Sequence, residues 1–258
     1  MKDKLSYFVK LILRVIHGTF FWKNYDSNVY WKNRSKEDGQ KSVLFKNEHY
    51  NMLVRNLSFQ VLDPIIKKLP ANSRVLDIGC GVGVVSRHIK SIRKDIVVDA
   101  VDFSEMIAVA RSHVSEDINW IESSAETYKS EPCFYDFILS SGCISAIRDI
   151  NNLEMALENM ADMLKKEGVM LFLDPFHKWK FLRRAPYSSQ DVISYLAQKN
   201  FSLIKKSGIL FWPYRDYFAN SDYDRDFVTK KVNEGERLLK RLGSHLWADY
   251  KVLQFQKV

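Results

Sequence analysis

The run VLDIGCGVGVV at residues 75–85 holds the residues best suited to bind a ligand through the backbone. It places Asp77 after two apolar residues, and Gly79, Gly81 and Gly83 follow at alternate positions. Glycine has no Cβ atom and tolerates backbone conformations that other residues avoid, so a ligand can approach the main chain closely. The order strand, acid, glycine loop and helix predicts a cofactor site at the carboxyl end of a strand.

The glycine spacing argues against two common nucleotide sites. A Walker loop requires Lys-Ser or Lys-Thr after its last glycine, and neither pair follows here. A dinucleotide loop has the spacing G-x-G-x-x-G, whereas the third glycine of this run comes one residue early, at Gly83. The carboxylate of Asp77 would repel a pyrophosphate but would suit a cationic or amine-bearing group.

Strand-like and helical segments alternate around this loop. The predicted strands are residues 74–79, 96–102, 118–123, 135–141 and 169–175. The predicted helices are residues 50–68, 82–93, 104–113, 144–148 and 151–166. This alternation is typical of βαβ units in a parallel sheet, whose ligands bind beyond the carboxyl ends of the strands.

The last third of the chain has a different pattern. A helix is predicted at residues 188–200 and a charged helix at 222–242, with strands at 202–212 and 250–258. Five parallel strands closed by a hairpin-like pair make a seven-stranded, mostly parallel sheet. The sequence therefore predicts one α/β Rossmann-like domain with an N-terminal helical extension.

Two parts of the chain are predicted to differ in role. Residues 1–50 are expected to form an amphipathic helix and a connector or lid. Residues 51–258 are expected to form the main domain, with acceptor-binding elements at about 175–250.

Composition sets further limits on function. The chain has 258 residues, of which 46% are hydrophobic and 27% charged, which is enough apolar material for one large core. Its net charge of +8 attracts polyanions without choosing among them. Cys80, Cys133 and Cys143 lack the spacing of a metal site or a disulfide framework, so we expect no metal and a reducing, cytoplasmic setting.

The N-terminal residues 1–22 predict an amphipathic helix. Lys10 and Arg14 interrupt the apolar stretch, which argues against a signal peptide and against a spanning helix. On a helical wheel these two residues fall on a narrow stripe opposite a broad apolar face. Such a helix lies in a membrane interface or packs on the domain or a partner, and both alternatives stay open. The first would place the protein at the inner face of the membrane.

The glycine loop and its neighbours resemble the class I S-adenosylmethionine-dependent methyltransferases. VLDIGCGVG matches the family's first motif at every position, and VDAVDFSEMIAVAR (98–111) matches its second strand, which ends in the acid Asp102. WIESSAETY (120–128), FYDFILSSGCI (134–144) and MLKKEGVMLFLD (163–174) match later landmarks. The resemblance covers about residues 60–175.

The resemblance implies S-adenosylmethionine as cofactor and methyl transfer as activity. It implies that Asp77 holds the methionine moiety, that Asp102 accepts the ribose hydroxyls, and that Phe103 and Met106 pack on the adenine. Ser124 stands where the family often has an aspartate for the adenine amino group. The cofactor-binding residues implied in this way are Asp77, Gly79, Cys80, Gly81, Gly83, Asp102, Phe103, Met106, Ser124, Ala125, Glu126, Ser140, Ser141 and, in the expected lid, Tyr30.

The segment after the fifth strand, DPFHKWKFLRRAPY (174–187), is predicted to meet the methyl acceptor. Asp174 and His177 are expected at the rim of the site, and His177 is the predicted general base because imidazole titrates near neutral pH. Aromatic rings and arginines suit sugars and phosphorylated groups. The predicted acceptor-binding residues are Arg183, Arg184, Tyr187, Trp212, Tyr214 and Arg215.

Several acceptor classes stay open at this point. The first is a sugar hydroxyl of a small molecule or glycan, lipid-linked and at the membrane surface. The second is an isoprenoid or other small metabolite. RNA or protein is the third, although lysines and arginines scattered among acids argue against nucleic acid. A non-catalytic cofactor-binding partner protein is a separate class, and the oligomeric state is open.

Overall fold

A computed structural model describes residues 27–36, 44–113, 117–180, 182–183 and 185–258. The helix predicted over residues 1–22 and the assignment of Arg184 fall outside these residues. Within the described part of the chain, no helix is long and apolar enough to span a bilayer.

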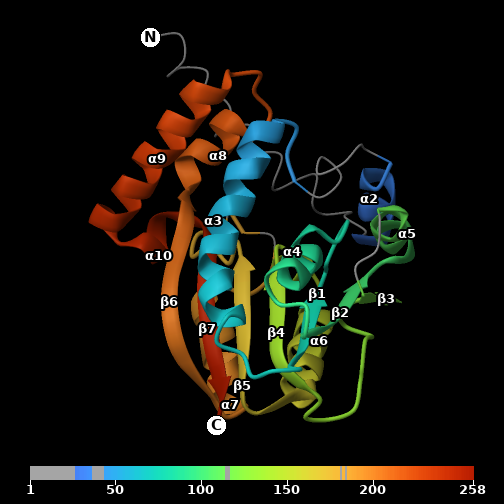
Figure 1. Ribbon diagram of the computed structural model, residues 1–258. Helices are drawn as coiled ribbons and strands as arrows, with labels where there is room; N and C mark the ends of the chain where they lie inside the picture. Colours follow the sequence, from blue (N-terminus) through green and yellow to red (C-terminus); the bar gives the residue numbers. More distant parts are fainter. Residues whose placement is uncertain (1–26, 37–43, 114–116, 181, 184) are drawn as a thin grey trace.

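Seven strands form a single sheet in the order β3-β2-β1-β4-β5-β7-β6 (Figure 1). The strands β1 to β5 pair in parallel, while β7 runs antiparallel to both β5 and β6. Their bounds are β1 Arg74–Ile78, β2 Val97–Asp102, β3 Ile118–Glu122, β4 Tyr135–Ser141, β5 Leu164–Asp174, β6 Phe201–Phe211 and β7 Ala248–Lys257. The predicted seven-stranded, mostly parallel α/β sheet is confirmed.

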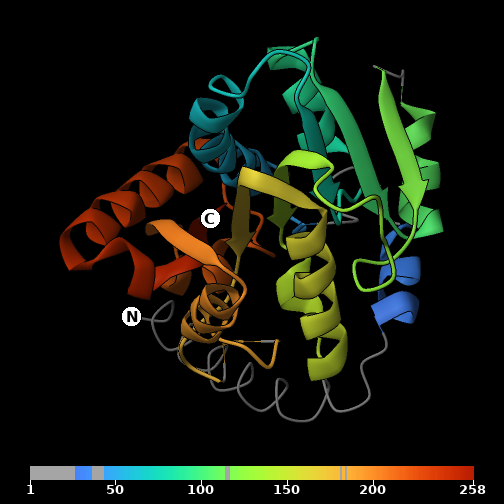
Figure 2. The same cartoon turned by 90° about the horizontal axis from the view of Figure 1, so that it is seen from below.

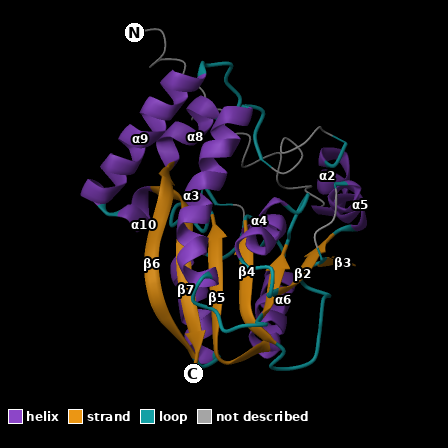
Figure 3. Ribbon diagram, viewed as in Figure 1, coloured by secondary structure: helices purple, strands orange, loops and turns teal. Residues whose placement is uncertain are grey.

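Helices cover both faces of the sheet (Figures 2 and 3). One core packs α3, α4, α5, α8 and α9 against the first face, and the other packs α6 and α7 against the second. The helices are α2 Ser27–Arg34, α3 Glu48–Ile66, α4 Val84–Ile92, α5 Ser104–Ser112, α6 Ile150–Met163, α7 Ser189–Gln198, α8 Trp212–Phe218, α9 Arg225–Leu242 and α10 Ser244–Trp247, with a 3-10 turn at Ile144–Ala146.

Local chemistry explains where several elements begin. The side chain of Asn47 accepts the backbone N–H of Tyr50 and caps α3. Ser188 and Asp191 form a reciprocal capping box at the start of α7. The central strands β1 and β4 are apolar and almost fully buried, as expected of strands covered on both faces.

The predicted pairing of the last two strands is confirmed, and two other expectations about elements need correction. β6 and β7 are antiparallel neighbours, with α8, α9 and α10 between them in the chain. The run at 212–218, for which no helix was predicted, is the helix α8, which has proline in its first turn. The connector that precedes residue 50, also given no helix, contains α2.

Candidate functional site

The glycine loop lies at the carboxyl end of β1 and leads into α4 (Figure 1). Gly79, Gly81 and Gly83 have φ angles of +73°, +58° and +77°, a region that side chains with a Cβ atom avoid. The backbone N–H groups of Gly79 and Cys80 both donate to the carbonyl of Val101 on β2. The loop is thus tied to the end of the neighbouring strand.

Two of these glycines also make room for protein side chains. A Cβ atom on Gly79 would lie 2.1 Å from the Cβ of Cys143, and one on Gly83 would lie 2.3 Å from the ring of Trp120. From the sequence alone, the approach of a cofactor accounts for all three glycines. The structure adds a separate packing requirement at Gly79 and Gly83.

Asp102 ends β2 and faces the glycine loop. Its Oδ2 accepts the N–H of Gly81 at 2.7 Å, and its Oδ1 accepts the N–H of Phe103 at 2.7 Å. Desolvation raises the pKa of Asp102 to about 6, against these two N–H donors and with a further contribution from the charge of Asp77. Each carboxylate oxygen keeps a lone pair, so Asp102 can still accept two hydroxyl groups.

Asp77 is buried on β1, directly before the loop, with 1% of its surface exposed. Its Oδ2 accepts the hydroxyl of Ser86 on α4 at 2.6 Å. Burial raises the pKa of Asp77 to about 6, although the Ser86 hydroxyl and the positive charge of Arg55 lower it. An acid held in this way is ready to meet a cation, which would favour its ionised form.

Arg55 on α3 is a site residue that the sequence analysis missed. Its charge acts on both Asp77 and Tyr250, and its Nε is buried without a hydrogen-bond partner among the described residues. An arginine beside an apolar helix face was the available signal, but only the fold shows that it reaches Asp77. A carboxylate and a guanidinium together complement the ammonium and carboxylate of an amino acid, as in the methionine end of S-adenosylmethionine.

The adenine side of the expected site lies between β2, β3 and α5. Phe103 precedes α5, and Met106 is 1% exposed on its first turn. The loop holding Ser124, Ala125 and Glu126 is fixed by a bond from Asn159 to the Glu126 carbonyl, 2.8 Å long.

The helix α2, which carries Tyr30, packs beside α5 (Figure 1). Lys32 of α2 forms an ion pair with Glu105 of α5 at 3.4 Å. This segment therefore lies next to the expected adenine side, as a lid would.

Ser140 and Asp174 form a closed network at the ends of β4 and β5. Both are fully buried, and the Ser140 hydroxyl donates to Asp174 Oδ2 at 2.9 Å. The hydroxyl and backbone N–H of Ser145 donate to the other Asp174 oxygen. Two expectations are corrected: Asp174 does not lie open at the rim, and the Ser140 hydroxyl is turned to Asp174 rather than to a ligand. Ser141 is half-buried at the end of β4.

His177 is fully buried three residues after β5 and does not lie at the rim as expected. Its Nε2 lies 3.2 Å from Oδ1 of Asp249 on β7, and Nη1 of Arg215 donates to the same oxygen at 2.7 Å. Burial tends to raise the pKa of Asp249, but Arg215 and His177 hold it below its ordinary value. The predicted Arg215 thus belongs to a buried ion-pair network, and Asp249, which sequence reasoning missed, is its centre.

The other predicted acceptor residues separate into two places. Trp212 stacks on Trp247 and meets Trp179 edge to face, and Arg183 donates weakly to the His177 carbonyl. Tyr214 packs between Phe211 and Phe218. Tyr187 instead lies on the other side of the sheet, where its hydroxyl donates to Glu154 of α6. The predicted cluster is therefore not a single surface.

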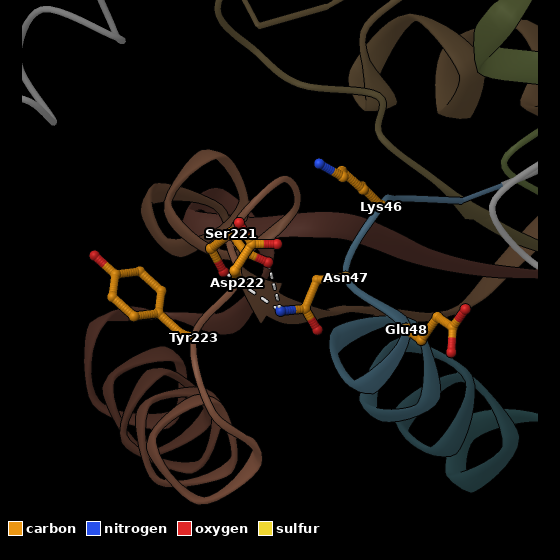
Figure 4. Close-up of a pocket in the computed structure, with 6 residues that line it drawn as sticks. All are labelled: Lys46, Asn47, Glu48, Ser221, Asp222 and Tyr223. Atoms are coloured by element: carbon orange, nitrogen blue, oxygen red, sulfur yellow. Dashed lines mark hydrogen bonds between the residues drawn. The ribbon is translucent and has the colours of Figure 1, made fainter.

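A surface pocket lies between the start of α3 and the loop before α9 (Figure 4). Asn47 points into the space between the two segments and donates to the carbonyl of Ser221 at 2.9 Å. The pocket's lining is Lys46, Asn47, Glu48, Ser221, Asp222 and Tyr223. No group of potential metal ligands occurs among the described residues.

Comparison with known families matches residues 48–219 to a methyltransferase domain. The malonyl-[acyl-carrier protein] O-methyltransferase of Bacillus anthracis is 28% identical over 130 residues, which cover 48% of this chain and 46% of the relative. The ubiquinone biosynthesis O-methyltransferase of Bartonella tribocorum is 27% identical over 191 residues, covering 64% and 75%. The chain spans less than half of the malonyl-[acyl-carrier protein] relatives that it matches.

Solved structures show the same fold. The N-methyltransferase NodS of Bradyrhizobium japonicum, in complex with S-adenosyl-L-homocysteine, has a TM-score of 0.57 at 15% identity, covering 88% of this chain and 96% of NodS. The YcgJ protein of Bacillus subtilis has a TM-score of 0.51 at 18% identity, covering 76% and 97%.

Proposed function

This chain belongs to the class I S-adenosylmethionine-dependent methyltransferases, and from that premise we propose that it methylates an oxygen atom of a small-molecule or glycan acceptor. A sugar hydroxyl, lipid-linked and at a membrane surface, is the acceptor that we put first. The observation that carries the oxygen assignment is that both groups of relatives described above are O-methyltransferases.

The cofactor is S-adenosylmethionine, and the residues at the carboxyl edge of the sheet fit it. Asp77 and Arg55 would hold the charged methionine end, and Asp102 the ribose hydroxyls. Phe103 and the loop at Ser124 would contact the adenine. When bound, the cofactor supplies an electrophilic methyl group on a sulfonium.

The chain's own residues position the acceptor for this transfer. A lone pair of the acceptor oxygen forms the new bond to the methyl carbon, the carbon–sulfur bond breaks, and its electrons stay on sulfur. The acceptor's proton must pass to a base. His177 stays a prediction for that role, and because it is buried with its Nε2 beside Asp249, a proton would reach it by way of the Asp249 carboxylate.

A sugar acceptor is supported by the chemistry of the residues around β7. The rings of Trp179, Trp212 and Trp247 contact one another, and Arg183 and Arg215 lie four and three residues along the chain from two of them. Aromatic faces with neighbouring arginines suit sugar rings and phosphorylated groups. The same cluster would also accept an apolar ring, and similarity to a ubiquinone biosynthesis enzyme favours an isoprenoid or aromatic metabolite as the second candidate.

Methyl transfer from labelled cofactor tests this proposal. The purified chain would be incubated with [methyl-³H]S-adenosylmethionine and, separately, with lipid-linked sugars, sugar nucleotides and a quinone-precursor extract. Base-stable label in the sugar fractions supports the first candidate, and label in the quinone fraction supports the second. Asp102→Ala is the matched inactive control. Cofactor binding without label in any fraction would favour the non-catalytic alternative.

Membrane contact and a cytoplasmic location at the inner membrane face are further parts of the proposal. They depend on residues 1–22, whose apolar and basic residues suit an anionic interface. Flotation with phosphatidylglycerol vesicles compares the full chain with a chain lacking residues 1–22. We expect the full chain to float and the shortened chain to stay in solution, and equal behaviour would refute the membrane contact.

A further inference from the structure

Tyr250, the third residue of β7, lies at the same sheet edge as the proposed cofactor site. Its neighbour Lys251 is in register with Asp174, the last residue of β5. One ring carbon of Tyr250 lies 4.0 Å from the position that a Cβ atom would take on Gly142, directly after β4. The ring therefore closes over the ends of β4 and β5, next to the strand that carries Asp77.

The surroundings of Tyr250 are highly charged. Burial, together with the negative charges of Asp249 and Asp174, raises the pKa of Tyr250 to about 12, although the positive charges of Arg215 and Arg55 lower it. Tyr250 is 8% exposed, and among the described residues none hydrogen-bonds its hydroxyl. The hydroxyl is therefore a neutral donor that is available to a ligand at this edge.

The position of Arg55 indicates which end of the proposed cofactor lies near Tyr250. The same guanidinium acts on Asp77 and on Tyr250, so the ring lies close to the methionine end of the proposed cofactor site. The methyl group leaves from the sulfonium at this end. A tyrosine ring also attracts a cation that lies within about 6 Å of its centre.

We propose that Tyr250 is a positioning residue at the junction of cofactor and acceptor: its ring borders the methyl group that is transferred, and its hydroxyl faces the acceptor. This inference rests on the proposed function and names a residue that none of the sequence motifs includes. It gives β7, the antiparallel strand, a direct part in the site.

Nuclear magnetic resonance of bound [methyl-¹³C]S-adenosylmethionine tests the proposal without knowledge of the acceptor. In the wild-type chain and in Tyr250→Phe, the ring should shift the methyl signal away from its free position, with the same cofactor Kd. In Tyr250→Leu the signal should return toward the free position. Tyr195→Leu, on α7 and away from the site, is the control and should match wild type.

The possible outcomes separate this inference from the proposed function. A wild-type chain that does not bind the cofactor refutes the proposed function. A methyl signal in Tyr250→Leu that matches wild type overturns the inference alone, as does a weakened Kd in Tyr250→Phe, which would assign the hydroxyl to the cofactor. If Tyr250→Leu does not fold, the wild-type chain with ring-labelled tyrosine replaces it. A nuclear Overhauser contact between the cofactor methyl protons and the Tyr250 ring would support the inference, and the absence of this contact would overturn it.

Discussion

Single residues at the sheet edge serve two purposes, ligand contact and packing. Asp102 binds two backbone N–H groups and still offers lone pairs, so its carboxylate organises the glycine loop as well as the proposed ribose site. Gly79 adopts a left-handed backbone conformation, which glycine tolerates, and its lack of a side chain leaves room for Cys143. These purposes can be separated by measurement.

Asp102→Ala is expected to weaken cofactor binding by about 1–3 kcal/mol, because a charge-assisted acceptor is lost. Calorimetric titration with S-adenosylmethionine measures this. Asp95→Ala, in a surface ion pair with Arg93 just before β2 and so at the opposite edge of the sheet, is the control and should bind as wild type does. Unchanged affinity in Asp102→Ala would remove this residue from the site.

Gly79→Ala is expected to destabilise the fold by about 1–3 kcal/mol through overpacking, in addition to backbone strain. Urea denaturation measures the change. Gly142→Ala gives the backbone cost, since Gly142 has a φ of +79° and the added Cβ would lie 4.0 Å from the nearest atom. A second substitution, Cys143→Gly, should recover part of the loss in Gly79→Ala. Equal losses at Gly79 and Gly142 would contradict the packing argument.

At the scale of elements, β7 is the strand that completes the site. It enters the sheet antiparallel between β5 and β6, so its first residues reach the edge where the parallel strands end. Asp249 on β7 binds His177 after β5 and Arg215 on α8. One carboxylate thereby ties three elements together.

Asp249→Asn should therefore destabilise the chain by about 3–5 kcal/mol, because it removes the negative partner of a buried ion pair that joins β7 to α8. Chemical denaturation provides the measurement. The control is Asp95→Asn, whose ion pair with Arg93 is at the surface and is screened by solvent, so its loss of stability should be much smaller. A loss at Asp249 as small as that at Asp95 would show that the network is not structural.

At the scale of the whole molecule, two acids in the site link cofactor binding to pH. Both Asp77 and Asp102 have a pKa raised to about 6. The folded state therefore binds more protons than the unfolded chain between pH 4 and 6, and the contribution of these groups to stability falls as pH rises through that window. The cationic methionine end of the cofactor favours the ionised form of Asp77. Cofactor affinity should therefore rise with pH, whereas the stability contribution of these groups falls.

As the pH drops below 6, Asp77 and Asp102 become protonated in the free protein. For each of these protons that must be released on binding, we expect cofactor affinity to fall by up to about tenfold per pH unit. Calorimetry at pH 5, 6 and 7.5 in buffers of different ionisation enthalpy would show both the change in Kd and the proton release. Asp102→Asn should have a shallower pH dependence. Affinity that does not vary with pH would mean that neither acid titrates with binding.

The sequence was most informative where chemistry and secondary structure are local. Periodicity located the seven strands and most helices, since apolar patterns and caps act over a few residues. It missed α2 and α8, whose aromatic and charged residues have no clear period.

The sequence by itself determined the glycine loop, the acids at the ends of β1 and β2, and hence the methyl donor, because these residues lie at fixed short distances from each strand end. Only the tertiary structure decided that Arg55, Asp249 and Tyr250 meet at the same edge. They come from α3 and from β7, about 200 residues apart, and the antiparallel entry of β7 brings them together. The burial of His177 and Asp174 was decided in the same way, because burial depends on which distant segments cover a residue.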